Sequence, residues 1–356
     1  MGADQWGKLA EILIQYSTGV KPGERVLITM METETFPLAR AVYAQTVMAG
    51  GQPHIEFQSA YLERDLMRLG SQQQLDWVPE MMAYGMEWAD VYVGLRGARN
   101  PFEFNSISSE RVTAHKRAMG TISAMRTEQT RWVLVRVPSE SLAQQAEMSL
   151  DDMMEFFFTA TLRDWSKEAK RYEEINEVFQ QSEQVRIIGQ DTDLTFSTEG
   201  RIYEVADGHL NMPDGEIFTS PLEDSIDGKI SFEFPGIYAG QKVEGISLEF
   251  SKGRLIRAGA RTNEDLLHSL LKMDDGASRV GEFGIGVNFG IDHFMGDILY
   301  DEKIGGTIHI AMGRAYKECG GTNQSALHWD IIKDLRQGGA VTLNGKKVLE
   351  DGKFLV

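Results

Sequence analysis

Two segments in the last third of the sequence carry histidines that are able to bind a metal ion. In His328-Trp329-Asp330, an extended backbone places the imidazole and the carboxylate on one face, where both can contact the same ion. His309 lies in the alternating run Gly306–Met312 and points away from the apolar face of that run. Taken alone, each histidine is more typical of a surface pair or of a hydrogen-bonded structural residue.

Three glutamates favour the metal interpretation. Each has a glycine nearby and apolar flanking residues, unlike the mixed charges of a solvated face: Glu216, Glu282 and Glu302. A buried carboxylate is costly unless it is paired or bound to a metal, although each glutamate taken singly is equally consistent with a capping or turn residue. With His309, His328 and Asp330 they form a set of nitrogen and oxygen donors without a thiolate, which suits Zn, Co or Mn. Two divalent ions per chain, with one carboxylate bridging them, would need about this many protein groups.

The first part of the chain has the pattern of a doubly wound α/β domain, which we place at residues 1–148. Short apolar runs alternate with amphipathic segments, as expected for βαβ units on a largely parallel sheet. The predicted strands are Arg25–Met30, His54–Phe57, Asp90–Leu95 and Trp132–Val137, and the predicted helices are Thr35–Ala49, Arg64–Met86 and Ser108–Met119. No Gly-x-Gly-x-x-Gly motif follows the first strand, so a dinucleotide site is not expected.

The pattern changes after residue 148. The charged amphipathic run Leu150–Gln181 predicts one helix linking two domains, at residues 149–184. Beyond it, short alternating strands dominate, with hairpin signals at Ser251-Lys252-Gly253 and Asn344-Gly345 and a helix at Asn263–Lys272. We therefore predict an α+β, mostly antiparallel, metal-binding domain at residues 185–356.

Composition limits the class of partner and the compartment. The chain has 356 residues, 42% of them hydrophobic, and no apolar run approaches the roughly 18 residues of a membrane span. A secretory signal is not expected, and its single cysteine, Cys319, fits a reducing cytoplasm. A formal charge of -17 disfavours nucleic acid and would attract a cationic group such as a peptide's α-ammonium, although acidity equally serves solubility alone.

Around the candidate ligands the sequence resembles the aminopeptidase T family of thermophilic metalloproteases. The motifs that carry the resemblance, strong from about residue 185 onward and only general before it, are Asn211–Glu216, Gly281–Gly286, Asp301–Tyr316 and Ser325–Asp330. The resemblance implies a homodimeric enzyme that removes N-terminal residues from peptides with a free N-terminus. It places the metal ligands at Glu216, Glu282, His309, His328 and Asp330, and the active-site tyrosine at Tyr316.

Glu302 departs from the family pattern. It stands seven residues before His309, with Gly305-Gly306 between them, whereas the family's glutamate lies closer to the histidine. A glycine bulge is able to absorb the extra residues. Glu302 is thus predicted either as a ligand or, like Glu282, as the carboxylate that carries a proton to the leaving amine, while Tyr316 donates a hydrogen bond to the oxyanion.

Two other functions fit a two-metal cluster less well. A two-metal phosphoesterase is one, but the motifs offer few cations to clamp a phosphate. The other is a non-catalytic metal-stabilised binding protein. It fits less well because a closed structural site needs only four ligands, and this set has more.

Among the remaining histidines, His293 is a candidate for lining the substrate channel, and His115 is expected to be solvated in a basic helix turn.

Overall fold

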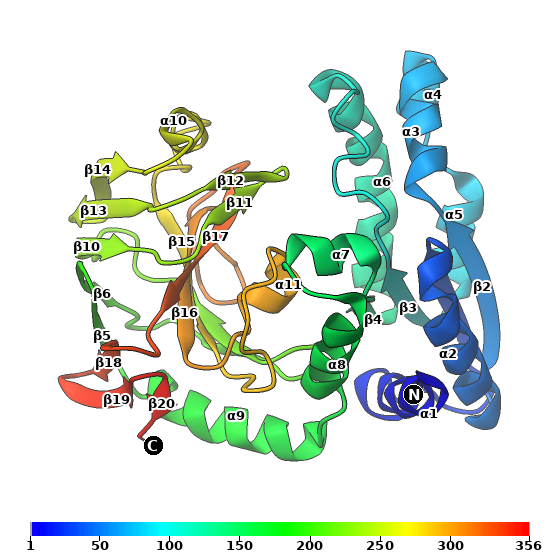
Figure 1. Ribbon diagram of the computed structural model, residues 1–356, viewed down its shortest axis with the longest axis horizontal. Coiled ribbons are helices and arrows are strands. Elements are labelled where there is room, and N and C mark those ends of the chain that lie inside the picture. Colours follow the sequence, from blue (N-terminus) through cyan, green and yellow to red (C-terminus); the bar gives the residue numbers. More distant parts are fainter. Residues whose placement is uncertain (1, 356) are drawn as a thin grey trace. The chain divides into compact units, whose positions relative to one another are not determined.

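The computed structural model describes residues 2–355, which fold into two compact units (Figure 1). The first unit extends to Trp165 and also contains Gly208–Pro213. The second contains Ser166–Asp207 and the chain from Asp214 onward. Residues Gly208–Pro213 therefore return to the first unit immediately before the segment that carries Glu216.

The first unit is built on a five-stranded parallel sheet with the order β2-β1-β3-β4-β8. The strands are β1 (Arg25–Met31), β2 (Gln52–Gln58), β3 (Val91–Arg96), β4 (Arg131–Arg136) and β8 (Asn211–Met212). The central strands β1 and β3 are almost fully buried, which explains their continuous apolar runs, since a parallel sheet is covered on both faces. The predicted α/β unit with a parallel sheet is confirmed.

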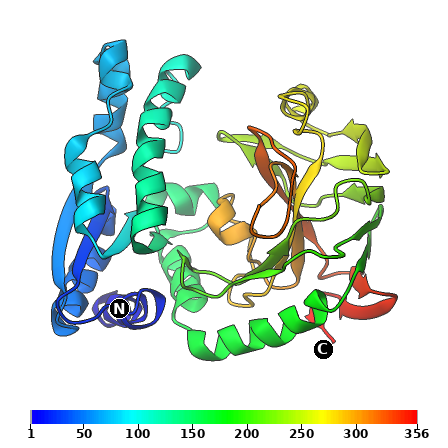
Figure 2. The same cartoon turned by 180° about the vertical axis from the view of Figure 1, so that it is seen from behind.

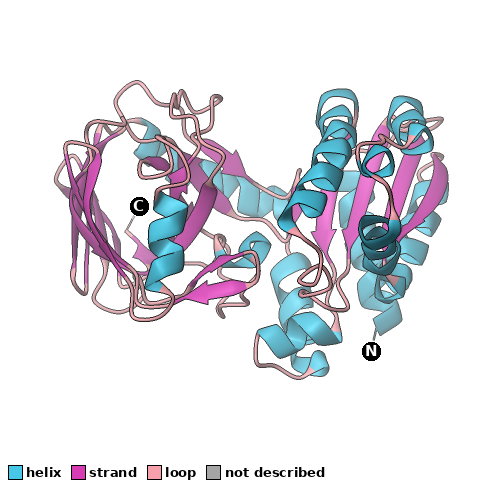
Figure 3. Ribbon diagram, turned by 90° about the horizontal axis from the view of Figure 1, so that it is seen from above, coloured by secondary structure: helices cyan, strands magenta, loops and turns pink. Residues whose placement is uncertain are grey.

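Helices cover both faces of this sheet (Figure 3). They are α1 (Gly2–Glu11), a π-helical segment (Ile12–Ser17), a 3₁₀ turn (Thr33–Thr35), α2 (Phe36–Met48), α3 (Ala60–Leu69), α4 (Gln72–Leu75), α5 (Glu80–Trp88), α6 (Ser109–Gln129), α7 (Glu140–Gln145) and α8 (Leu150–Thr161). The run predicted as a single helix, Arg64–Met86, is divided among α3, α4 and α5. Ser71 caps α4 and Pro79 precedes α5, and both residues favour a new helix start over a continued one.

The segment Leu150–Gln181, for which the sequence predicts one linking helix, forms α8 and α9 (Trp165–Gln180) with a short break between them. Ser149 caps α8 by accepting a hydrogen bond from the Asp152 amide at 3.1 Å. Figure 2 shows α9, in green, along one side of the strand-rich second unit. There, Gln180 donates to the Arg201 carbonyl and accepts from the Tyr203 amide.

The second unit contains an eight-stranded sheet, a five-stranded sheet and a small hairpin. The eight-stranded sheet has the order β14-β13-β10-β6-β5-β18-β19-β20, with β5 (Gln184–Gly189), β6 (Thr192–Ser197), β10 (Asp227–Ser231), β13 (Ser247–Ser251), β14 (Arg254–Gly259), β18 (Ala340–Leu343), β19 (Lys346–Glu350) and β20 (Lys353–Phe354). The five-stranded sheet has the order β17-β16-β15-β9-β7, with β7 (Glu204–Ala206), β9 (Glu216–Thr219), β15 (Val280–Gly286), β16 (Thr307–Gly313) and β17 (His328–Asp334). The remaining elements are β11 (Gly236–Tyr238), β12 (Gln241–Val243), α10 (Glu264–Leu271) and α11 (Ile298–Asp301).

The strand pairings of the second unit are antiparallel, as the sequence predicts. Both predicted hairpin turns are present. Lys252 and Gly253 have positive φ values between β13 and β14, and Asn344 and Gly345 have them between β18 and β19. Phe196 of β6 contacts Phe283 of β15 with ring centroids 5.0 Å apart, so the two sheets share a core. Within residues 2–355, no helix is long and apolar enough to cross a membrane.

Candidate metal centre

The predicted ligands lie on four adjacent strands, β9, β15, β16 and β17. Antiparallel register places Glu216 opposite Gly286 and His309 opposite Gly284. Ala311 of β16 is paired with Glu282 of β15 on one side and with Asp330 of β17 on the other. Side chains two apart share a face, so glycines and an alanine occupy the middle of the face that carries the ligands. Residues far apart in the sequence therefore converge on one patch of sheet.

Gly284 leaves the space that the His309 imidazole fills. A Cβ atom at Gly284 would lie 2.1 Å from Cε1 and 2.2 Å from Nε2 of His309. Any larger residue at this position would displace the ring, because these distances are far shorter than van der Waals contact. The glycine that flanks Glu282 in the sequence thus has a steric role in positioning the histidine.

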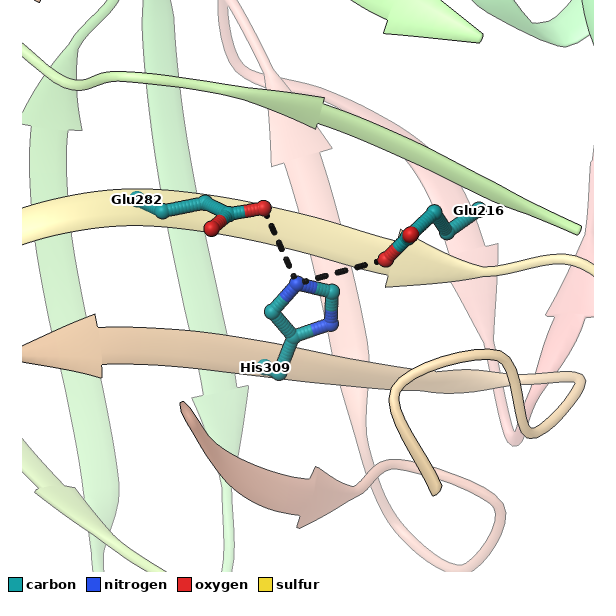
Figure 4. Close-up of side chains that lie close together, drawn as sticks. All are labelled: Glu216, Glu282 and His309. Carbon is teal, nitrogen blue, oxygen red and sulfur yellow. Dashed lines mark hydrogen bonds and ion pairs between the residues drawn. The ribbon is translucent and has the colours of Figure 1, made fainter. Parts of the chain in front are cut away.

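The first group of metal-ligating atoms comes from Glu216, Glu282 and His309 (Figure 4). His309 Nε2 lies 3.3 Å from Glu282 Oε1 and 3.6 Å from Glu216 Oε2. All three residues are buried, with exposed fractions of 7% or less. Two carboxylates and an imidazole that face one another from neighbouring strands give a hard, nitrogen-and-oxygen donor set.

The second group comes from Glu282, His328 and Asp330. His328 Nε2 lies 3.2 Å from Glu282 Oε2 and 3.7 Å from Asp330 Oδ1. His328 Nδ1 donates a hydrogen bond to the Arg314 carbonyl at 2.8 Å, so Nε2 is the nitrogen that would bind a metal. Glu282 thus directs one oxygen to each group, in the manner of a bridging carboxylate.

The electrostatics of the cluster are those of a strongly coupled buried site. Burial acts to raise the pKa of Glu282, but hydrogen bonds from His309 and His328 outweigh it and lower the pKa to about 2. Burial acts to lower the pKa of both histidines, yet Glu282 and the other carboxylates raise them, to about 10 for His309 and about 9 for His328. The carboxylates therefore impose a negative field that favours any cation.

Asp330, the remaining ligand candidate, also fits a site for a divalent ion. Burial, followed by the charge of Glu282, raises the pKa of Asp330 to about 6. Within the described residues, Asp330 Oδ1 is buried and accepts no hydrogen bond. An oxygen in this position is costly to bury unless a cation neutralises it. The chemistry of the donor set and this oxygen both match a divalent metal.

Glu302 lies beside the cluster but outside both groups of metal-ligating atoms among residues 2–355. Its carboxylate accepts a short hydrogen bond from Lys303 Nζ. Lys303 has no exposed surface and also contacts Glu216 Oε1 at 3.3 Å and Asp214 Oδ1 at 4.0 Å. Burial, followed by the charge of Glu216, raises the pKa of Glu302 to about 7. Glu302 thus lies against a buried lysine, beside the cluster and outside its two ligand groups.

Tyr316 lies close to the second group. Its ring contacts His328 with centroids 5.1 Å apart and Phe218 with centroids 5.3 Å apart. Burial raises the pKa of the Tyr316 phenol, and the charges of Glu282 and Asp330 raise it further. The phenol is therefore protonated at neutral pH and able to donate a hydrogen bond.

Other predictions about individual residues have mixed outcomes. His115 is buried in α6, at 7% exposure, so the prediction that it is solvated is wrong; helix packing, and not its charged neighbours, sets its burial. His293 is exposed, contacts Asp292 at 2.5 Å and belongs to neither metal group. Sequence reasoning did not identify Lys303 or Asp214 as members of the cluster. The only signal is a lysine and an aspartate adjoining apolar, glycine-rich motifs.

Comparison with known proteins bears on what this cluster does. The family model of the thermophilic metalloproteases (M29) matches residues 3–354. The chain belongs to the M29 family of thermophilic metalloproteases. Aminopeptidase 2 of Geobacillus stearothermophilus is 24% identical over 97% of this chain and 94% of its own length. The predicted class, a metal-dependent aminopeptidase, is confirmed, and so is the predicted family.

Solved structures confirm the fold of this M29 chain. AmpT from Thermus thermophilus superposes with a TM-score of 0.85 at 23% identity and covers 99% of both chains. A 2,5-dihydroxypyridine dioxygenase from Pseudomonas putida KT2440 superposes with a TM-score of 0.65 at 15% identity, over 100% of this chain and 98% of the other. The two neighbours carry names from different reaction classes, so the chemistry has to be argued from the side chains of the cluster.

Proposed function

We propose that this aminopeptidase holds two divalent ions, one at Glu216, Glu282 and His309 and the other at Glu282, His328 and Asp330. The observation that carries the proposal is the position of Glu282, whose Oε1 and Oε2 face different histidines. Divalent ions bound here would polarise a carbonyl oxygen and lower the pKa of a water from roughly 15.7 toward roughly 7. Zn, Co or Mn suits these donors.

The side chains around the proposed ions have separate roles in peptide cleavage. Tyr316, kept protonated by burial and by Glu282, donates a hydrogen bond to the oxyanion that forms from the first carbonyl of the peptide. Glu302, held by Lys303, accepts a proton and passes it to the leaving amine, which its pKa of about 7 allows. We assign Glu302 this role because it lies outside both groups of ligand atoms.

The proposed substrates are peptides with a free N-terminus. The free α-amine of the substrate would bind one of the proposed ions or a carboxylate beside them, and an internal peptide bond offers no such group. The formal charge of -17 acts in the same direction over longer distances. This explains why the enzyme would act as an exopeptidase.

The test combines activity with metal analysis. The purified protein, loaded separately with Zn, Co or Mn, is assayed on leucine, arginine and phenylalanine amides and on a phosphomonoester. We expect amino-acid release and two ions per chain. Release of phosphate without any amino acid would support the phosphoesterase alternative, and one ion per chain would contradict the two-metal arrangement.

We also propose that the enzyme is a cytoplasmic homodimer. The single cysteine supports the location, and an exposed apolar stripe on α2 supports the dimer. The stripe consists of Phe36, Tyr43 and Val47, which are 53%, 43% and 54% exposed and lie on one helical face. Light scattering on the purified protein measures the mass. We expect the mass of a dimer, and Val47→Glu should lower it to that of a monomer. A monomeric mass for the unmodified protein would contradict the dimer.

A further inference from the structure

A cavity of about 300 Å³ opens beside His328 and Asp330 of the metal cluster. It is lined by the β11–β12 hairpin, the loop that leads into α11, and β17 at the edge of its sheet. Apolar side chains form most of its wall: Pro235, Ile237, Phe294, Ile298, Trp329 and Ile332. A cavity of this size, with mostly apolar walls and a few polar groups, is typical of a small-molecule binding site.

The walls of the cavity are held in place by specific contacts. Trp329 Nε1 donates to the Ile237 carbonyl at 3.0 Å, which joins β17 to the hairpin. Gly236 makes this possible, because a Cβ atom there would lie 2.4 Å from the Trp329 ring. On the opposite side, Phe294 stacks on Phe234 with centroids 4.9 Å apart and an interplanar angle of 9°. The cavity is therefore preformed.

Besides Asp330, two aspartates line the cavity, and both are engaged by backbone amides. Asp301, at 2% exposure, accepts a hydrogen bond from the Met295 amide at 2.6 Å. Asp297 caps α11 by accepting from the Leu299 amide at 3.2 Å. These carboxylates hold the loop around α11 and are poorly placed to pair with a basic side chain that enters the cavity.

We propose that this cavity receives the side chain of the substrate's N-terminal residue and selects leucine, methionine and phenylalanine over alanine, glycine and arginine. The inference rests on the proposed function, because a first carbonyl placed at His328 and Asp330 has its side chain next to the cavity. Burying the extra carbons of leucine favours its amide over the alanine amide by at least about tenfold in kcat/KM.

Substitutions at Ile298 test the proposal. Ile298 lines the cavity and is 39% exposed, so a larger side chain can enter the cavity without disturbing the core. Ile298→Trp should lower kcat/KM for leucine and phenylalanine amides by about tenfold and leave the alanine amide and the metal content nearly unchanged. Ile298→Asp should shift preference toward the arginine amide. Ile256→Trp, at a 60% exposed position on β14, is the control and should change none of these values.

The outcomes separate the cavity from the enzyme activity. If all amides are cleaved equally, or if arginine is preferred with and without the Ile298 variants, the cavity assignment is overturned and the aminopeptidase activity stands. If no amide is cleaved, the proposed function is overturned, and calorimetry with free L-leucine and L-alanine then tests the cavity. Tighter binding of leucine that Ile298→Trp abolishes would support the cavity, and equal affinities would overturn it.

Discussion

β3 of the parallel sheet and β16 of the antiparallel sheet are both buried along nearly their whole length, but they bury different chemistry. The buried part of β3 contributes mostly apolar side chains, and the hydroxyl of its buried Tyr92 is hydrogen-bonded to Thr29 at 2.6 Å. β16 carries His309, fully buried among carboxylates from two other strands. The interior of the first sheet is stabilised mainly by apolar burial, whereas the second sheet buries charges that neutralise one another.

The same contrast holds for ion pairs. Arg25 and Asp90 of the first unit form a bidentate pair at the start of the sheet, with 40% and 37% of their side chains exposed. Lys303 of the second unit has no exposed side chain and pairs with Glu216, whose side chain is 9% exposed. Water solvates and screens the charges of the first pair, which weakens their interaction, whereas it is largely excluded from the second pair. Changes in the buried cluster should therefore affect function strongly, and changes at the exposed pair should affect stability weakly.

The largest expected effect comes from removing the shared ligand. Glu282→Ala should abolish binding of both ions and lower turnover by more than about 10³-fold, beyond the loss of a single oxyanion donor. His328→Ala should remove one ion and also abolish activity. Metal analysis and amide hydrolysis measure both effects. Thr29→Val, which removes a buried hydrogen bond from the parallel sheet, should leave metal content and turnover unchanged. Full turnover in both ligand variants would refute the site.

The next effect concerns Tyr316. Tyr316→Phe keeps the ring against His328 but removes the hydroxyl, so turnover should fall roughly 10²- to 10³-fold with unchanged metal content. Tyr203→Phe is a matched control, since Tyr203 is buried in the same unit and hydrogen-bonds Thr198 away from the cluster. Equal losses in both variants would show that Tyr316 only packs.

Two fully buried lysines allow a sharper comparison. Lys303 contacts Glu216 and Glu302, whereas Lys333 contacts Glu233 and the Gln190 carbonyl. Lys303→Met should release both glutamates from their positions and lower turnover by roughly 10- to 100-fold, with metal retained and the visible spectrum of the cobalt form changed. Lys333→Met should alter stability only. If the two variants have the same spectrum and turnover as the unmodified enzyme, Lys303 has no positioning role.

The smallest effect is expected at the exposed pair. Hydrogen bonds from Arg25 lower the pKa of Asp90 to about 2, below its ordinary value of 3.8. The pair therefore stabilises the fold fully above about pH 4, and this contribution is lost as the pH falls toward 2. Asp90→Asn should cost less than about 1 kcal/mol at pH 7, because the pair is exposed, and progressively less below pH 4. Urea unfolding across this pH range measures it. A cost that does not change with pH would rule out the ion pair as its source.

Much of the fold is predictable because local signals agree with tertiary packing. The strands β1, β3 and β4 follow from continuous apolar runs, and the turn at Asn344-Gly345 follows from residues that tolerate positive φ. The division of Arg64–Met86 into three helices was not predicted, since amphipathic periodicity continues across Ser71 and Pro79. Nor does any local pattern indicate that Gly208–Pro213 adds β8 to the first sheet, because that pairing joins distant parts of the chain.

By itself, the sequence determined the kind of chemistry: nitrogen and oxygen donors without thiolates, on strands whose alternation fixes which face each donor occupies. The sequence motifs also identified the metalloprotease family. Only the tertiary structure decided that Glu282 divides its oxygens between two histidines, that Gly284 makes room for His309, and that Lys303 lies buried against Glu302. Spacing along one strand determines the face to which each side chain points, but not its distance from side chains on neighbouring strands. Register and the packing of side chains set those distances, and they arise only when the whole sheet forms.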